Sequence, residues 1–95
     1  MLARSKPALE DIQSISPGRI SILPGDLSDL SLGQQAVDIA LSKYGSLDAL
    51  VVNHGILGEV NKVADSDPVG WRETFDVNFF SVVACVRCST LVAIF

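Results

Sequence analysis

Apolar positions recur at helical spacing in three stretches of this chain, and short apolar runs without that spacing lie between them. Leu9, Ile12 and Ile15 predict a short helix over residues 7–15, which a Ser-Pro-Gly turn ends. Residues 19–23 have the composition of a strand and precede a Pro-Gly pair. The first third of the chain therefore predicts a helix, a turn and a strand.

The second helical pattern covers residues 31–44 and is the best defined of the three. Ser31, followed three residues later by Gln34, predicts a capping box at its start. Gly45 predicts a left-handed end. One apolar stripe at i, i+4 spacing consists of Leu32, Ala36, Val37, Ala40, Leu41 and Tyr44.

Residues 47–52 form an apolar run with almost no alternation, which predicts a strand covered on both faces. Asp67 and Pro68 then predict the N-cap and first residue of a last helix. Asn78 falls on the apolar stripe of that helix, and its amide there needs hydrogen-bond partners. The stripe consists of Trp71, Phe75, Phe79, Val82 and Val86.

The order helix, strand, helix, strand, helix predicts an α/β fold with a parallel sheet, in a single domain over residues 1–95. In open parallel sheets, ligands bind beyond the carboxyl ends of the strands. Asp26-Leu27 follows the first predicted strand, and Asn53-His54-Gly55 follows the second. These residues fit a ligand site, but Asp and Asn also make ordinary turns after strands, and the two interpretations have equal weight.

Composition excludes several classes of protein. With 48% hydrophobic and 19% charged residues, the chain is too apolar to be disordered. A net charge of −4, with scattered basic residues, argues against nucleic-acid binding. The first residues lack the apolar run of a signal peptide, so we expect a cytoplasmic protein.

Two features near the end of the chain have alternative interpretations. Residues 79–95 are apolar enough to suggest a tail anchor, but Arg87 lies near the middle, which favours a buried helix. Cys85 and Cys88 have C-x-x-C spacing but lie within the predicted helix. We interpret both as small buried apolar residues and expect no metal site.

Taken together, four segments resemble the short-chain dehydrogenase/reductase family in their order and spacing. Residues 48–56 resemble the end of the family strand that carries Asn-Asn-Ala-Gly. Asn53 and Gly55 match that motif, whereas His54 stands where the family has Ala. The resemblance implies that Asn53, His54 and Gly55 line the cofactor site. Residues 71–78 resemble the segment that carries the family's catalytic Asn.

That segment places the catalytic Asn at Asn78 and, by resemblance, its backbone carbonyl in a proton relay. Gly25-Asp26-Leu27 resembles the family's adenine-contacting Asp and the residue after it. Ala3-Arg4-Ser5 resembles the end of its second strand, where Arg favours the 2′-phosphate of NADP. The resemblance therefore implies a partial Rossmann-like fold, a cofactor that is NADP, with NAD as a second possibility, and a small carbonyl or alcohol substrate.

Several parts of the family pattern have no counterpart in the chain. No glycines give the phosphate loop Thr-Gly-x-x-x-Gly-x-Gly, and no position gives the catalytic Ser. The family's proton donor is a Tyr with Lys four residues later, but the only tyrosine, Tyr44, is followed at that distance by Asp48. We therefore expect an internal fragment of an NADP-preferring oxidoreductase that is inactive by itself.

The same resemblance makes a prediction about association. The family's strand order is 3-2-1-4-5-6-7, and the two strands predicted here match strands 3 and 4, which are not neighbours. Their open edges predict self-association. The alternative functions are a non-catalytic remnant that binds a partner through these edges, and the tail-anchored protein.

Overall fold

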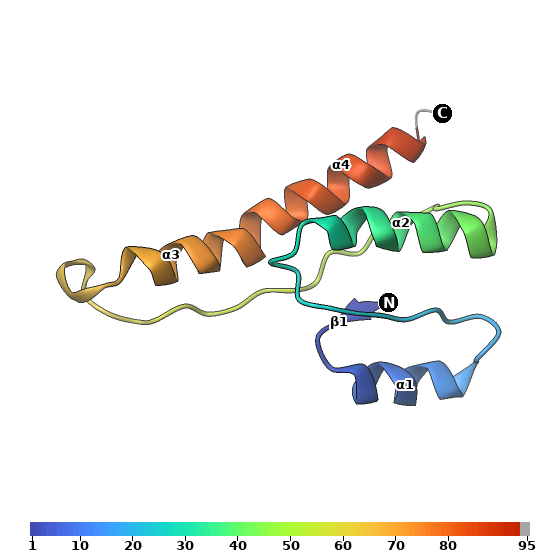
Figure 1. The fold of residues 1–95 in the computed structure, drawn as a ribbon, viewed down its shortest axis with the longest axis horizontal. Coiled ribbons are helices and arrows are strands. Elements are labelled where there is room, and N and C mark those ends of the chain that lie inside the picture. Colours follow the sequence, from blue (N-terminus) through green and yellow to red (C-terminus); the bar gives the residue numbers. More distant parts are fainter. Residues whose placement is uncertain (94–95) are drawn as a thin grey trace.

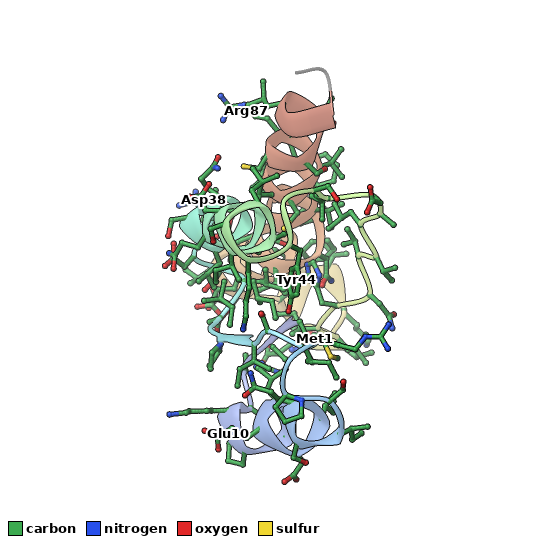
Figure 2. The ribbon with its side chains drawn as sticks, turned by 90° about the vertical axis from the view of Figure 1, so that its right-hand side faces the viewer. Met1, Glu10, Asp38, Tyr44 and Arg87 are labelled. Carbon is green, nitrogen blue, oxygen red and sulfur yellow. The ribbon has the colours of Figure 1, made fainter. Side chains whose placement is uncertain are left out.

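A computed structural model describes residues 1–93 and places helices on both sides of a thin layer of extended chain. Helix α1 (Lys6–Ile15) lies on one side of that layer, and helices α2 (Ser31–Tyr44) and α4 (Ser81–Ala93) lie on the other (Figures 1 and 2). The helices α2 and α4 pack against each other. This arrangement is that of a partial Rossmann-like α/β fold, as predicted.

The ordered sheet is short and parallel. Strand β1 (Leu2–Ala3) pairs with strand β2 (Leu23–Pro24), with Leu2 opposite Leu23. The observed strand β2 therefore includes only the last residue of the predicted strand over 19–23, and it continues to Pro24. It is short because its partner β1 offers only two residues for pairing.

The strand expected over residues 47–52 is not formed. This segment is extended chain, and within residues 1–93 it makes no backbone hydrogen bond to a strand. It is also not covered on both faces, since Val51 is 85% exposed. A strand needs a neighbouring ladder, and β1 and β2 pair with each other instead.

Helix α2 spans the predicted residues, but its start differs from the prediction. The carboxylate of Asp29 accepts a hydrogen bond from the Ser31 backbone N–H at 3.0 Å, so Asp29 satisfies one of the free donors at this end. The Ser31 hydroxyl accepts from Gln35, and Gln34 bonds to another residue. The capping box was therefore wrong, whereas Gly45 ends the helix with φ of 81° as predicted.

The last helical region is continuous through a turn of π-helix. Helix α3 (Pro68–Phe75) begins at the Asp67 cap, whose carboxylate accepts from the Val69 N–H at 3.0 Å. The π-helical turn Asp76–Phe80 follows and leads directly into α4. The predicted boundary at Asp67 is confirmed.

The inward face of this helical region differs from the predicted apolar stripe. Trp71, Phe75 and Phe79 are half-exposed, because α3 extends beyond α2 and no other helix covers it there (Figure 1). Smaller residues of this region are more covered: Ser81 and Cys88 are buried, and Gly70, Thr74, Val77 and Cys85 are among the partly covered positions. Of the predicted stripe, Val82 is partly covered, whereas Val86 is exposed.

Small residues allow the close approach of α2 and α4. A Cβ atom added at Gly33 of α2 would lie 3.3 Å from the Cα atom of Cys85. Cys88 and Ser81 are buried, and both cysteines are free. The interpretation of the cysteines as small packing residues agrees with this geometry.

A helix long and apolar enough to cross a bilayer, which the tail-anchor alternative requires, is not found in the part of the chain that the structure describes.

Candidate functional site

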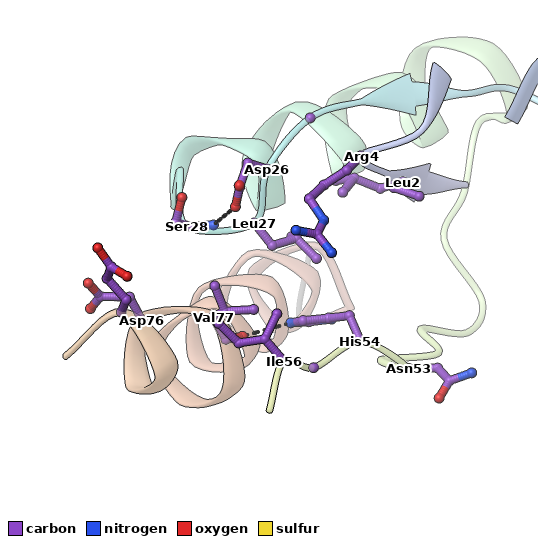
Figure 3. A pocket seen from close by; sticks show the side chains of 14 residues that line it. Leu2, Arg4, Asp26, Leu27, Ser28, Asn53, His54, Ile56, Asp76 and Val77 are labelled. Atoms are coloured by element: carbon purple, nitrogen blue, oxygen red, sulfur yellow. Dashed lines mark hydrogen bonds between the residues drawn. The ribbon is translucent and has the colours of Figure 1, made fainter. Parts of the chain in front are cut away.

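One cavity of about 590 Å³ opens where β1, β2 and the extended segment end (Figure 3). Its position agrees with the rule that ligands bind beyond the carboxyl ends of parallel strands. All six residues that the sequence suggested for cofactor binding line it, although they come from three separate parts of the chain. They are Arg4, Asp26, Leu27, Asn53, His54 and Gly55.

Asp26 lies in the turn after β2, and its carboxylate is held by the next residues of that turn. Its Oδ1 atom accepts a hydrogen bond from the Ser28 backbone N–H at 2.9 Å. The backbone and side chain of Ser28 lower the pKa of Asp26, and the nearby positive charge of Arg4 adds to the effect. Asp26 is therefore an anionic acceptor at neutral pH.

Arg4 follows β1 and reaches into the same cavity. Figure 3 shows its guanidinium between the Asp26-Leu27 turn and His54. Within residues 1–93, Arg4 makes no ion pair and no side-chain hydrogen bond. Its planar donors are therefore free to bind an anionic group of a ligand.

His54 anchors the extended segment to the π-helical turn. Its Nε2 atom lies 2.6 Å from the Ser81 hydroxyl and 3.0 Å from the Val77 carbonyl oxygen. Ser81 is only 1% exposed and donates to the same Val77 oxygen. The prediction that His54 lies beside the pocket agrees with this placement.

Asn78 makes a second anchor three residues before Ser81. Its Oδ1 accepts from the Ile56 backbone N–H at 2.8 Å, and its Nδ2 donates to the Ile56 carbonyl oxygen at 2.8 Å. Asn78 itself does not line the cavity, but Ile56 does. The predicted need for amide partners is thus met by the backbone of the cavity wall.

Gly55 is placed where a side chain would disturb this anchor. A Cβ atom at Gly55 would lie 3.3 Å from the Asn78 Oδ1 atom. Asn53 differs from the other predicted residues, because Figure 3 shows its amide directed away from Arg4 and Asp26. Its contribution to the cavity is at the wall rather than in the interior.

The sequence analysis missed several residues of this site. Val77 and Ser81 hold His54, while Ser28, Glu73 and Asp76 line or order the cavity. Ser81 follows Asn78 by three residues, so helical spacing alone could have placed both on one face. Nothing in the spacing indicates that a histidine 27 residues earlier would reach Ser81.

Tyr44 lies apart from this cavity. Its hydroxyl is 2.7 Å from the Ser21 hydroxyl, at the end of α2. Among residues 1–93, no cluster of three or more His, Cys, Asp or Glu side chains could hold a metal ion.

A layer of extended chain between helices, with a polar cavity at the strand ends, is the arrangement of the Rossmann-like class of α/β domains. The family model described as short chain dehydrogenase matches residues 1–91. This chain therefore belongs to the short-chain dehydrogenase/reductase family, which is a family of oxidoreductases.

Individual relatives agree with this assignment. An uncharacterized oxidoreductase of Schizosaccharomyces pombe is 37% identical over 81 residues, which cover 85% of this chain and 32% of the relative. A benzil reductase ((S)-benzoin forming) of Saccharomyces cerevisiae is 38% identical over 65 residues, covering 64% of this chain and 25% of that protein.

Solved structures extend the likeness to the fold. The crystal structure of a short-chain dehydrogenase/reductase from Saccharomyces cerevisiae superposes with a TM-score of 0.90 and 32% identity. The match covers 96% of this chain and 36% of that structure. The chain thus spans about a third of the length of the relatives that it matches.

Proposed function

We propose that this chain supplies the adenosine-binding part of a nicotinamide cofactor site, with a preference for NADP(H) over NAD(H). The observation that carries the proposal is that Arg4, Asp26, Leu27 and Gly55 line one and the same cavity. Family membership supports a nicotinamide nucleotide as the ligand. The choice between the two nucleotides rests on Arg4.

The residues present fit the chemistry of such a ligand. The fork of donors on Arg4 matches a 2′-phosphate, which NADP carries and NAD lacks. The anionic Asp26 can accept from the adenine amino group, and the Leu27 backbone N–H can donate to a ring nitrogen. Gly55 leaves room for the ribose to approach the backbone.

The whole protein, in this proposal, is an oxidoreductase that acts on a small carbonyl or alcohol substrate. A bound nicotinamide cofactor would supply or accept the hydride. Asn78 uses its amide to hold Ile56 at the cavity wall, which leaves only its backbone for a proton relay. One relative is a benzil reductase, which agrees with a carbonyl substrate.

The cytoplasmic location of the protein stays a prediction.

The chain by itself is proposed to be inactive. Tyr44 is the sequence's only tyrosine, and its hydroxyl is engaged by Ser21 rather than placed at the cavity. No other side chain at the cavity matches the Tyr-x-x-x-Lys pair of the family. Turnover of NADPH by the purified 95-residue chain would contradict this statement.

The experiment that tests the cofactor proposal compares the two nucleotides. Titration of the chain with NADPH and with NADH, followed by calorimetry, should give tighter binding of NADPH. Arg4→Lys should reduce the difference, because an ammonium lacks the planar fork, and Arg4→Glu should abolish it. Equal affinities in the unsubstituted chain would reject the NADP preference, and no binding of either nucleotide would reject the cofactor site.

A second proposal is self-association through open edges of the extended layer. A cavity of about 620 Å³ separates β1 from residues 47–53, and α2 forms part of its wall. The unpaired backbone of residues 47–52 borders this cavity. Such edges pair readily with another strand.

Analytical ultracentrifugation over a range of concentrations tests this second proposal. Dimers or larger species of the unsubstituted chain are expected. Val51→Lys places a charge at an exposed position of the open segment and should shift the chain toward monomer. A monomer at all concentrations would contradict self-association.

A further inference from the structure

His54 has a defined tautomer, because its surroundings distinguish a donor from an acceptor. The Val77 carbonyl oxygen can only accept, and it lies 3.0 Å from Nε2. The Ser81 hydroxyl has one proton, which it donates to the same Val77 oxygen. The contacts among Nε2, the Ser81 hydroxyl and the Val77 oxygen are all attractive only if Nε2 carries a proton. Nε2 then donates to both oxygens, and the Ser81 hydroxyl donates to the Val77 oxygen.

The opposite tautomer creates a repulsive contact. If Ser81 donated to an unprotonated Nε2, the nitrogen lone pair would face the Val77 oxygen at 3.0 Å. The hydrogen bond from the buried Ser81 to its own helix would also be lost. These contacts therefore favour the neutral tautomer with its proton on Nε2 and its lone pair on Nδ1.

The anchor that Nε2 makes is important for the position of the cavity wall. Residues 46–61 make no backbone hydrogen bond to another element within the described chain. In the described part of the chain, two side chains connect this segment by hydrogen bonds to the π-helical turn and α4, namely His54 and Asn78. The hydrogen bonds of His54 thus fix the position of Asn53-His54-Gly55, as pairing with a neighbouring strand would otherwise do.

Nδ1 is available to a ligand. His54 lines the cavity, and within residues 1–93 its Nδ1 atom has no hydrogen-bond partner. The charged groups that line the same cavity are Arg4, Asp26, Glu73 and Asp76. Nδ1 is an uncharged acceptor beside these charged groups. It can bind a hydroxyl or amide donor of a ligand without adding a charge near a phosphate.

We propose that His54 has two separate roles, one for each ring nitrogen. Nε2–H is a permanent donor that positions the cavity wall on Ser81 and Val77. Nδ1 is an acceptor for a hydroxyl or amide donor of the bound nucleotide. The second role rests on the proposed cofactor site, whereas the first does not.

Nuclear magnetic resonance tests the tautomer directly. His54 is the only histidine of the chain, so its ring signals need no assignment by mutation. Long-range proton–nitrogen spectra at about pH 8, where an ordinary imidazole is neutral, should show a protonated Nε2 and an unprotonated Nδ1. A protonated Nδ1 at that pH would overturn both roles.

Two matched substitutions separate the two roles. His54→Gln keeps a donor near the position of Nε2 and removes the Nδ1 acceptor. It should leave the Tm almost unchanged and weaken NADPH binding about three- to tenfold. His54→Asn keeps a polar group near Nδ1 but cannot reach Ser81, and it should lower the Tm by about 4–8 °C.

The outcomes distinguish failure of this inference from failure of the cofactor proposal. Equal NADPH affinity in the unsubstituted chain and His54→Gln would reject the acceptor role, and an equal loss of Tm in both variants would reject the anchor. If the unsubstituted chain binds no NADPH, the cofactor site and the acceptor role fail together. The spectra and the Tm values then still judge the anchor.

Discussion

Asn78 and Ile56 exchange two hydrogen bonds of 2.8 Å, although 22 residues separate them in sequence. The amide of Asn78 pairs with the backbone of Ile56 much as a neighbouring strand would. This contact holds the end of the extended segment against the π-helical turn. It explains why an amide on a helix face bordered by apolar residues is not left without partners.

Replacing Asn78 with Asp should separate its two hydrogen bonds. An aspartate can still accept from the Ile56 N–H, but it cannot donate to the Ile56 carbonyl oxygen. We expect a loss of about 1–2 kcal/mol in the free energy of unfolding, and a similar or larger loss for Asn78→Ala. Urea unfolding followed by circular dichroism measures both. Asn61→Ala is the matched control for Asn78→Ala, because within residues 1–93 the exposed Asn61 amide donates only to the Glu59 carboxylate, two residues earlier.

Replacing Gly33 with Val should separate α2 from α4. A Cβ atom at Gly33 already lies 3.3 Å from the Cys85 Cα atom, and the two further methyl groups of Val have no space against that backbone. Overpacking of this kind costs about 1–3 kcal/mol. Gly18→Val is the comparison, since nothing lies within 4 Å of a Cβ atom at Gly18. Equal Tm values for the two variants would contradict the close contact of α2 and α4.

Asp29 should make the stability of the chain depend on pH at the acidic end. Hydrogen bonds from the side chain and backbone of Ser31 lower the pKa of Asp29 from its ordinary value of 3.8. A carboxyl group with a lowered pKa in the folded state stabilises the fold above its ordinary pKa. This contribution is lost as the pH falls through the lowered pKa. Thermal unfolding between about pH 2 and pH 6 should therefore show a steeper acid loss in the unsubstituted chain than in Asp29→Asn. Parallel curves would show that Asp29 does not cap α2.

Cys85 should react slowly with thiol reagents at neutral pH. Burial, and then the neighbouring Cys88, raise the pKa of the Cys85 thiol above its ordinary value of 9.0. Since the thiolate is the reactive form, alkylation by iodoacetamide should accelerate with pH beyond the range of an ordinary cysteine. A cysteine introduced at the exposed position Ser42 gives the reference rate. Faster reaction of Cys85 than of that reference at pH 7 would indicate an activated thiol and contradict its packing role.

The sequence predicted those parts of the fold that depend on local chemistry. Helix α2 with its glycine end and the Asp67-Pro68 start of α3 follow from helix propensity and capping. The missed parts depend on partners. Residues 47–52 have strand composition but pair with no strand in residues 1–93. Ser31 is the first helical residue rather than the N-cap, and its hydroxyl accepts from Gln35.

The candidate site shows the same division. Which residues lie at the strand ends could be predicted from chain order, and the cavity brings them together. The hydrogen bonds that hold His54 and Asn78 could not be predicted. Their partners are the buried Ser81 hydroxyl and the backbone of Val77 and Ile56, which only the folded chain brings close. The aromatic residues of α3 were expected to face inward because they are hydrophobic. Hydrophobicity alone does not show which face of the helix has room for large side chains.

The small inward residues of the α3–α4 region reverse the usual relation between hydrophobicity and sensitivity to mutation. Phe79 is 55% exposed and can shrink with little consequence, whereas Ser81 is 1% exposed and has no room to grow. A systematic mutational scan should find stricter size limits at the buried Ser81 and Cys88 than at the half-exposed Phe75 and Phe79, which a hydropathy profile ranks higher. In this helical region, the size of a side chain rather than its polarity should decide which substitutions the fold accepts.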